Sequence, residues 1–184
     1  MSEIASQQQL RMGFARWAMV TVPAILFLGF LSGKLAGPSG TGRWYQELAK
    51  PAFQPPTWAF PVAWSLLYIL LGLALAMILN ARGAKGRGLA LGLFAVQMLL
   101  NLLWSPLFFG AHQVSAALIL LLVLFVLATA CTYAFSKIRK VAGWLMLPYL
   151  AWLAFASVLN FEVDRLNPDA ETFVPAVPQT EVIL

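Results

Sequence analysis

Residues 44–64 read WYQELAKPAFQPPTWAFPVAW, a connector rich in proline and tryptophan that runs directly into an apolar segment. The Lys-Pro pair at 50–51 and the Pro-Pro pair at 55–56 fix the backbone and withhold amide donors, which predicts a stiff, extended loop up to about Thr57. Pro61 falls in the first turn of the following helix, where a missing N–H costs nothing. Large rings on both sides of this turn predict a lid over an apolar pocket. An aromatic belt that anchors a membrane helix is an equal alternative for any one tryptophan.

The composition around this connector is that of a membrane protein. The 184 residues fit one domain, and 61% are hydrophobic while only 10% are charged, against about 25% charged residues in soluble domains. The net charge of +5 comes from basic residues that lie between the apolar runs. This placement indicates determinants of membrane topology and not a surface that binds nucleic acid.

Five apolar runs are long enough to cross a hydrocarbon core of about 30 Å. They cover about residues 14–33, 57–79, 88–109, 114–136 and 141–163. The first run is too long for the apolar part of a signal peptide and lacks a clear cleavage site. The sequence therefore predicts an all-α membrane protein, a five-transmembrane-helix bundle over residues 14–166. We expect the polar tails, 1–13 and 167–184, to be disordered.

Five spans place the two termini on opposite sides of the membrane. Of the 12 basic residues, eight would lie on the N-terminal side and four, namely Lys34, Arg43, Lys50 and Arg165, on the other. Because cytoplasmic loops carry the excess of Lys and Arg, we expect a cytoplasmic N-terminus and an external tryptophan-rich loop.

Three of the predicted helices carry aromatic and polar residues at helical spacing, so that each forms a stripe on one face. The stripes contain Trp64 and Tyr68 in the second span, Gln97, Asn101 and Trp104 in the third, and Tyr149, Trp152 and Ala156 in the fifth. If the stripes converge, they build a flat-walled pocket with a few hydrogen-bonding groups, suited to a large planar apolar molecule. Hydrogen bonding between helices is an equally good interpretation of Gln97.

No catalytic or metal-binding constellation is present in the sequence. The sole histidine, His112, falls in a short turn, and the sole cysteine, Cys131, lies in the middle of an apolar run. No carboxylate lies within a span, which argues against ordinary proton-coupled transport. Gly88 and Gly92 form a small-xxx-small pair that permits close helix approach, either within the chain or in a homodimer.

The motifs together resemble the TspO/MBR family, the translocator proteins or tryptophan-rich sensory proteins. The resemblance covers roughly residues 14–166 and rests on the connector at 44–64, NLLWSPLFFG at 101–110, WLMLPYLAW at 144–152 and ASVLNFEVDRLN at 156–167. It implies a five-helix bundle, commonly dimeric, that binds tetrapyrroles such as protoporphyrin IX and haem. Many family members also bind sterols and isoquinoline or benzodiazepine-type drugs.

Carried over by motif, the resemblance implies roles for individual residues. Trp64 and Trp152 look like the paired tryptophans associated with porphyrin binding and with light-dependent porphyrin breakdown. Further pocket and lid residues are implied at Asn101, Trp104 and Ala156, and at Trp44, Tyr45 and Trp58. Phe53 stands where the family often has tryptophan, and the sterol-type pattern at Leu159, Phe161 and Arg165 has phenylalanine in place of tyrosine.

The resemblance implies a membrane receptor or carrier of tetrapyrroles, with no resident cofactor and no metal site. The alternatives are a light-dependent, enzyme-like breakdown of porphyrin by the pocket tryptophans and a transporter proper. Arg43 and Lys50, by charge and position, are candidates to pair with porphyrin propionates. A bacterial inner membrane is favoured by the helical spans, although family members have also been placed in outer membranes.

Overall fold

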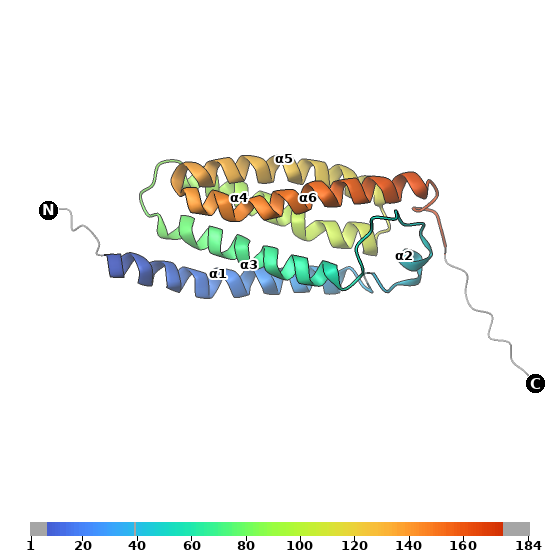
Figure 1. Ribbon diagram of the computed structural model, residues 1–184, viewed down its shortest axis with the longest axis horizontal. Helices are drawn as coiled ribbons and strands as arrows, with labels where there is room; N and C mark the ends of the chain where they lie inside the picture. Colours follow the sequence, from blue (N-terminus) through green and yellow to red (C-terminus); the bar gives the residue numbers. More distant parts are fainter. Residues whose placement is uncertain (1–6, 39, 175–184) are drawn as a thin grey trace, which may run out of the picture.

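Five long apolar helices run along the molecule in the computed structural model, which describes residues 7–38 and 40–174 (Figure 1). No strand occurs among these residues. The helical elements are α1 (Gln7–Leu35), α2 (Arg43–Glu47), α3 (Ala59–Asn80), α4 (Arg87–Ser105), η1 (Pro106–Gly110), α5 (Val114–Ile138) and α6 (Lys140–Leu166). The membrane-length helices are α1, α3, α4 continued by η1, α5 and α6. The predicted five-helix, all-α membrane bundle is thus confirmed.

The ends of the bundle differ from the sequence-based boundaries. Helix α1 begins at Gln7, within the predicted tail, because residues 7–12 are strong helix formers without glycine or proline. At the other end, residues 167–174 form turns packed on the connector, and Ala170 is buried. Polar composition predicted disorder here, but specific hydrogen bonds fix these residues. The remaining predicted tail residues, 1–6 and 175–184, lie outside the described residues.

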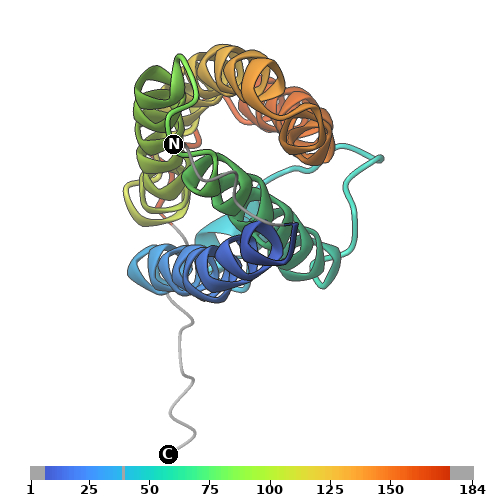
Figure 2. The ribbon, with the colours of Figure 1, turned by 90° about the vertical axis from the view of Figure 1, so that its left-hand side faces the viewer.

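The spans form a ring in the order α1, α3, α6, α5 and α4, seen end-on in Figure 2. The α1 backbone closely approaches α3 at Gly72, where Thr21 Oγ1 donates a hydrogen bond to the Gly72 carbonyl oxygen at 2.7 Å. A Cβ added to Gly72 would lie 2.7 Å from the Val22 Cα, so only glycine fits there. Cys131, which lies in the middle of an apolar run of the sequence, is fully buried in the apolar core between the helices.

Large apolar side chains also cover the outside of the bundle, as a hydrocarbon solvent requires. Exposed examples from three helices are Met19, Phe27, Ile119, Val126 and Trp144. A Cβ added to Gly88 or Gly92 would meet nothing within 4 Å, so these glycines do not permit close packing within the chain.

The third span ends in a single wide turn. Residues 106–110 adopt a π-helix that begins at Pro106, whose missing N–H cannot continue the α-helical ladder. This turn directs Phe108 and Phe109 toward the connector between α1 and α3. His112 follows with a positive φ of 57°.

Candidate ligand-binding cavity

A cavity of about 740 Å³ lies at the end of the bundle that the connector covers. It is lined by side chains from all five spans, from the connector and from α2, and most of its lining is apolar. Its volume falls within the range of roughly 300–1,000 Å³ that is typical of sites for small molecules and cofactors.

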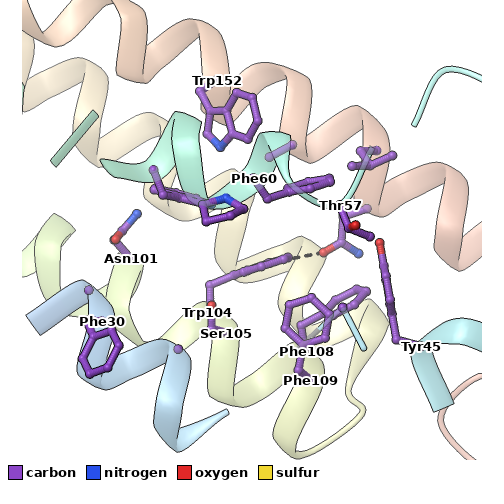
Figure 3. Close-up of a pocket in the computed structure, with 18 of the residues that line it drawn as sticks. Phe30, Tyr45, Thr57, Phe60, Asn101, Trp104, Ser105, Phe108, Phe109 and Trp152 are labelled. Atoms are coloured by element: carbon purple, nitrogen blue, oxygen red, sulfur yellow. Dashed lines mark hydrogen bonds between the residues drawn. The ribbon is translucent and has the colours of Figure 1, made fainter. Parts of the chain in front are cut away.

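Flat aromatic rings form much of the cavity wall (Figure 3). The Trp64 and Trp152 ring centroids are 6.2 Å apart with their planes at 80°, and Trp152 meets Phe60 edge-to-face at 6.0 Å. On another side, Trp104 stacks on Phe108 at 5.1 Å with an interplanar angle of 20°. These edge-to-face and stacked contacts fix the orientation of each ring before any ligand arrives.

A chain of hydrogen bonds runs from the cavity wall into the core. Tyr68 Oη donates to Asn101 Oδ1 at 2.9 Å, and Asn101 Nδ2 donates to Tyr149 Oη at 3.1 Å. Tyr149 Oη then donates to Gln97 Oε1 at 2.9 Å. Tyr68 and Asn101 line the cavity, whereas Tyr149 and Gln97 are fully buried behind it. The interhelical interpretation of Gln97 therefore holds, and Tyr149 also supports the wall and does not form it.

A second polar contact joins α4 to α6 at the cavity wall. Trp104 Nε1 donates to Asn160 Oδ1 at 3.3 Å, the dashed line in Figure 3, and Asn160 Nδ2 donates to the Val114 carbonyl oxygen at 3.0 Å. Asn160 thus holds the Trp104 ring against the cavity and ties both to the start of α5.

The connector covers the cavity mouth and includes the short helix α2. Tyr45 and Trp58 both line the cavity, but Trp58 is 67% exposed at the rim while Tyr45 is buried. Burial raises the pKa of the Tyr45 hydroxyl, partly offset by a hydrogen bond with Gln54, so the phenol stays protonated at neutral pH. Pro61 lies in the first turn of α3, as predicted.

Trp44 anchors the connector and does not line the cavity. Its ring stacks on His112 at 4.2 Å with an interplanar angle of 12°, and its Nε1 donates to the Ala170 carbonyl oxygen at 2.9 Å. Asn167 adds a two-point contact with Ala49, accepting from its N–H at 2.8 Å and donating to its carbonyl at 2.9 Å. Residues 167–174 thus hold the connector, which forms the lid of the cavity, in place from outside.

The two cations proposed from the sequence to pair with propionates lie away from the cavity. Lys50 Nζ donates to the carbonyl oxygens of Gln46 and Leu48 at 2.9 and 3.0 Å, and it lies 4.8 Å from the Tyr45 ring centroid. Partial burial lowers the pKa of Lys50. Arg43 borders a separate, smaller cavity of about 150 Å³. The geometry favours neither residue as a direct ligand contact in the main cavity.

The structure brings together most of the residues selected from the sequence. The ones that line the cavity are Tyr45, Trp58, Trp64, Tyr68, Asn101, Trp104, Trp152 and Ala156. The sterol-type pattern divides: Leu159 lines the cavity, Phe161 is 51% exposed, and Arg165 pairs with Glu162 at 2.7 Å.

Sequence reasoning missed the contribution of α1 and several aromatic rings. Gly29, Phe30 and Gly33 of α1 form one wall, and Phe60 and Phe155 add rings near Trp152. The spacing of Gly29 and Gly33 is a small-xxx-small signal that could have indicated this wall. Phe60 stands within the connector motif itself.

Comparison with known proteins identifies the family. Residues 19–166 match the family model described as the TspO/MBR family. The chain belongs to the TspO/MBR family.

Relatives within the TspO/MBR family come from bacteria and from animals. The chain is 39% identical over 144 residues to the tryptophan-rich protein TspO of Chlorobaculum tepidum, a match covering 78% of this chain and 90% of that protein. It is 40% identical over 148 residues to the tryptophan-rich sensory protein of Cereibacter sphaeroides, covering 77% and 91%. The translocator protein of Bos taurus is 39% identical over 154 residues, covering 79% and 90%.

Among the described residues, no group of three or more His, Cys, Asp or Glu side chains is placed to hold a metal ion. Neither His112 nor Cys131 lines the cavity. The cavity therefore offers a ligand planar apolar walls, the neutral hydrogen-bonding groups of Tyr68 and Asn101, and one basic side chain, Lys34.

Proposed function

We propose that this protein binds tetrapyrroles, such as protoporphyrin IX and haem, within the membrane and acts as their receptor or carrier. The observation that carries this proposal is the 740 Å³ cavity walled by the rings of Trp64, Trp104 and Trp152. A porphyrin is a large, rigid, planar and mostly apolar molecule, which complements flat aromatic walls. Relatives named sensory or translocator proteins are in keeping with a protein that recognises or carries a ligand.

Affinity in this proposal comes from burial and ring contacts. Apolar surface removed from water contributes roughly 25 cal/mol per Å², and each aromatic pair adds about 0.5–1.5 kcal/mol beyond that burial. Tyr68 and Asn101 add neutral hydrogen-bonding groups that can meet the polar atoms of the ring system. Because neither His112 nor Cys131 is among the described residues that line the cavity, we expect metal-free porphyrin to bind about as well as haem.

Replacing Trp64 or Trp152 with phenylalanine is expected to weaken protoporphyrin IX binding about two- to tenfold, the range that corresponds to the loss of one aromatic contact. The measurement is a titration of the purified full-length protein in the dark, followed by porphyrin fluorescence. Trp144→Phe is the matched control, because Trp144 lies on α6 like Trp152 but is exposed on the outside of the bundle. Absence of saturable binding by the unaltered protein, or an equal loss in the control, would contradict the proposal.

Light-dependent porphyrin breakdown is a second candidate, favoured by the Trp64 and Trp152 rings lying 6.2 Å apart at the cavity wall. Both rings would then lie beside a light-excited porphyrin. Illuminating the bound complex distinguishes the two functions. A receptor or carrier leaves the porphyrin spectrum unchanged, whereas breakdown bleaches it with turnover and is lost in both phenylalanine variants.

A further inference from the structure

Lys34 is the one charged residue among the described residues that line the main cavity. It lies in the last turn of α1, one turn beyond Phe30, and Gly37 and Pro38, in the segment that leads from α1 toward α2, follow it in the cavity lining. The cavity therefore has a cation at the junction between the membrane-spanning wall and the lid. This feature does not follow from the aromatic walls or from the neutral hydrogen-bonding chain.

No carboxylate among the described residues offsets this charge at the cavity. Within residues 7–38 and 40–174, the Lys34 ammonium lies over the Phe30 ring, 5.3 Å from its centroid, and forms no ion pair. Within the described part of the chain, Glu162 pairs with Arg165 at the end of α6 and not with Lys34. A cation at an otherwise uncharged apolar cavity favours a ligand that brings its own negative charge.

The neutral polar groups, Tyr68 and Asn101, lie deeper in the cavity than the charged one, Lys34. Gly29 packs against Tyr68, whose hydroxyl donates to Asn101. Lys34 is five residues further along α1, which corresponds to about 7.5 Å at about 1.5 Å per residue, in the direction of the lid. A ligand that meets both groups has a neutral polar or apolar edge toward Tyr68 and an anionic edge toward the lid.

We propose that Lys34 recognises a carboxylate of the ligand, so that the cavity selects planar carboxylic acids and holds the acid edge at the lid. This proposal rests on the proposed function and deepens it, because the propionates of protoporphyrin IX lie on one edge of the ring. Carboxylates of this kind are ionised at neutral pH. In this proposal Lys34, and not Arg43 or Lys50 as suggested from the sequence, pairs with the propionates.

The test compares protoporphyrin IX with its dimethyl ester, which has the same ring and no negative charge. We expect Lys34→Gln to weaken binding of the free acid about three- to tenfold, the effect of losing one partly exposed charge-assisted contact, and to leave ester binding unchanged. Lys34→Arg is expected to retain most of the affinity for the free acid. Lys85→Gln is the charge-matched control, since Lys85 lies in the exposed loop between α3 and α4, at the other end of the bundle (Figure 1).

The possible results separate this proposal from the proposed function. If the unaltered protein binds both forms and Lys34→Gln weakens neither, or weakens both equally, the Lys34 proposal is wrong and tetrapyrrole binding stands. If the unaltered protein binds neither form, both proposals are overturned. A selective loss of the free acid in Lys34→Gln, absent in Lys85→Gln, supports both.

Discussion

Replacing Gly72 with alanine is expected to lower the free energy of unfolding by about 1–3 kcal/mol, the usual cost of overpacking a well-packed site. The added Cβ would lie 2.7 Å from the Val22 Cα, and this atom belongs to the backbone of α1 and cannot rotate away. The two helices must separate, which also disturbs the hydrogen bond from Thr21 to the Gly72 carbonyl. Thermal unfolding of the full-length protein in detergent measures the effect.

Gly33→Ala is the control for this prediction, because a Cβ at Gly33 meets nothing within 4 Å and alanine favours a helix over glycine. We expect the control to unfold at the same temperature as the unaltered protein or slightly above it. An unchanged unfolding temperature in Gly72→Ala would show that α1 and α3 are not in close contact at this point.

Replacing Gly29 with alanine is expected to have the opposite profile, with a loss of porphyrin affinity of about tenfold and little change in stability. A Cβ at Gly29 would overlap the Tyr68 ring, so the ring must move, and the open space beside it is the cavity. The movement breaks the hydrogen bond from Tyr68 to Asn101, worth about 0.5–1.5 kcal/mol, and reduces the room for a ligand.

Titration with protoporphyrin IX and thermal unfolding, both applied to Gly29→Ala, check this prediction. Unchanged affinity would mean that Tyr68 does not shape the binding site. A stability loss as large as that of Gly72→Ala would mean that the Tyr68 ring is fixed by the core and has no freedom to move into the cavity.

The bundle could be predicted from the sequence because the bilayer imposes a length and an apolar composition on each span. Hydropathy does not show where a helix begins beyond the membrane, and α1 accordingly starts at Gln7, well before the apolar run. Proline and acidic residues after Arg165 suggested disorder, yet the contacts of Asn167 with Ala49 and of Trp44 with the Ala170 carbonyl fix residues 167–174. Such contacts join residues more than 100 positions apart, and no local pattern reveals them.

The sequence could predict which helix faces carry the site residues, but not how far each residue lies from the cavity. Helical spacing correctly placed Trp64, Asn101 and Trp152 toward the interior, since residues three or four apart share a face. The same spacing selected Gln97 and Tyr149, which lie fully buried behind the cavity wall. Periodicity gives the direction of a side chain, whereas its distance from a cavity depends on the packing of neighbouring helices.

The wall from α1 could not be predicted for a related reason. The stripes on α3, α4 and α6 were recognised by aromatic and amide residues, whereas the α1 wall combines Gly29 and Gly33 with a single ring, that of Phe30, and so shows no such stripe. The role of Trp44 as an anchor depends on its contacts with His112 and Ala170. Its motif alone does not distinguish a ring that holds the lid from a ring that faces the ligand.

The central claim, that this cavity is where a tetrapyrrole binds, is tested most directly by filling it. Ala156 lines the cavity one turn after Trp152, and phenylalanine at this position would extend into open space. Ala151→Phe is the matched control, since Ala151 is exposed on the same helix.

Protoporphyrin IX is titrated into both variants and into the unaltered protein in the dark. We predict saturable binding that Ala156→Phe weakens at least about tenfold, which corresponds to about 1.4 kcal/mol, while Ala151→Phe retains it. Equal affinity in all three proteins would contradict the account, because the porphyrin would then bind elsewhere.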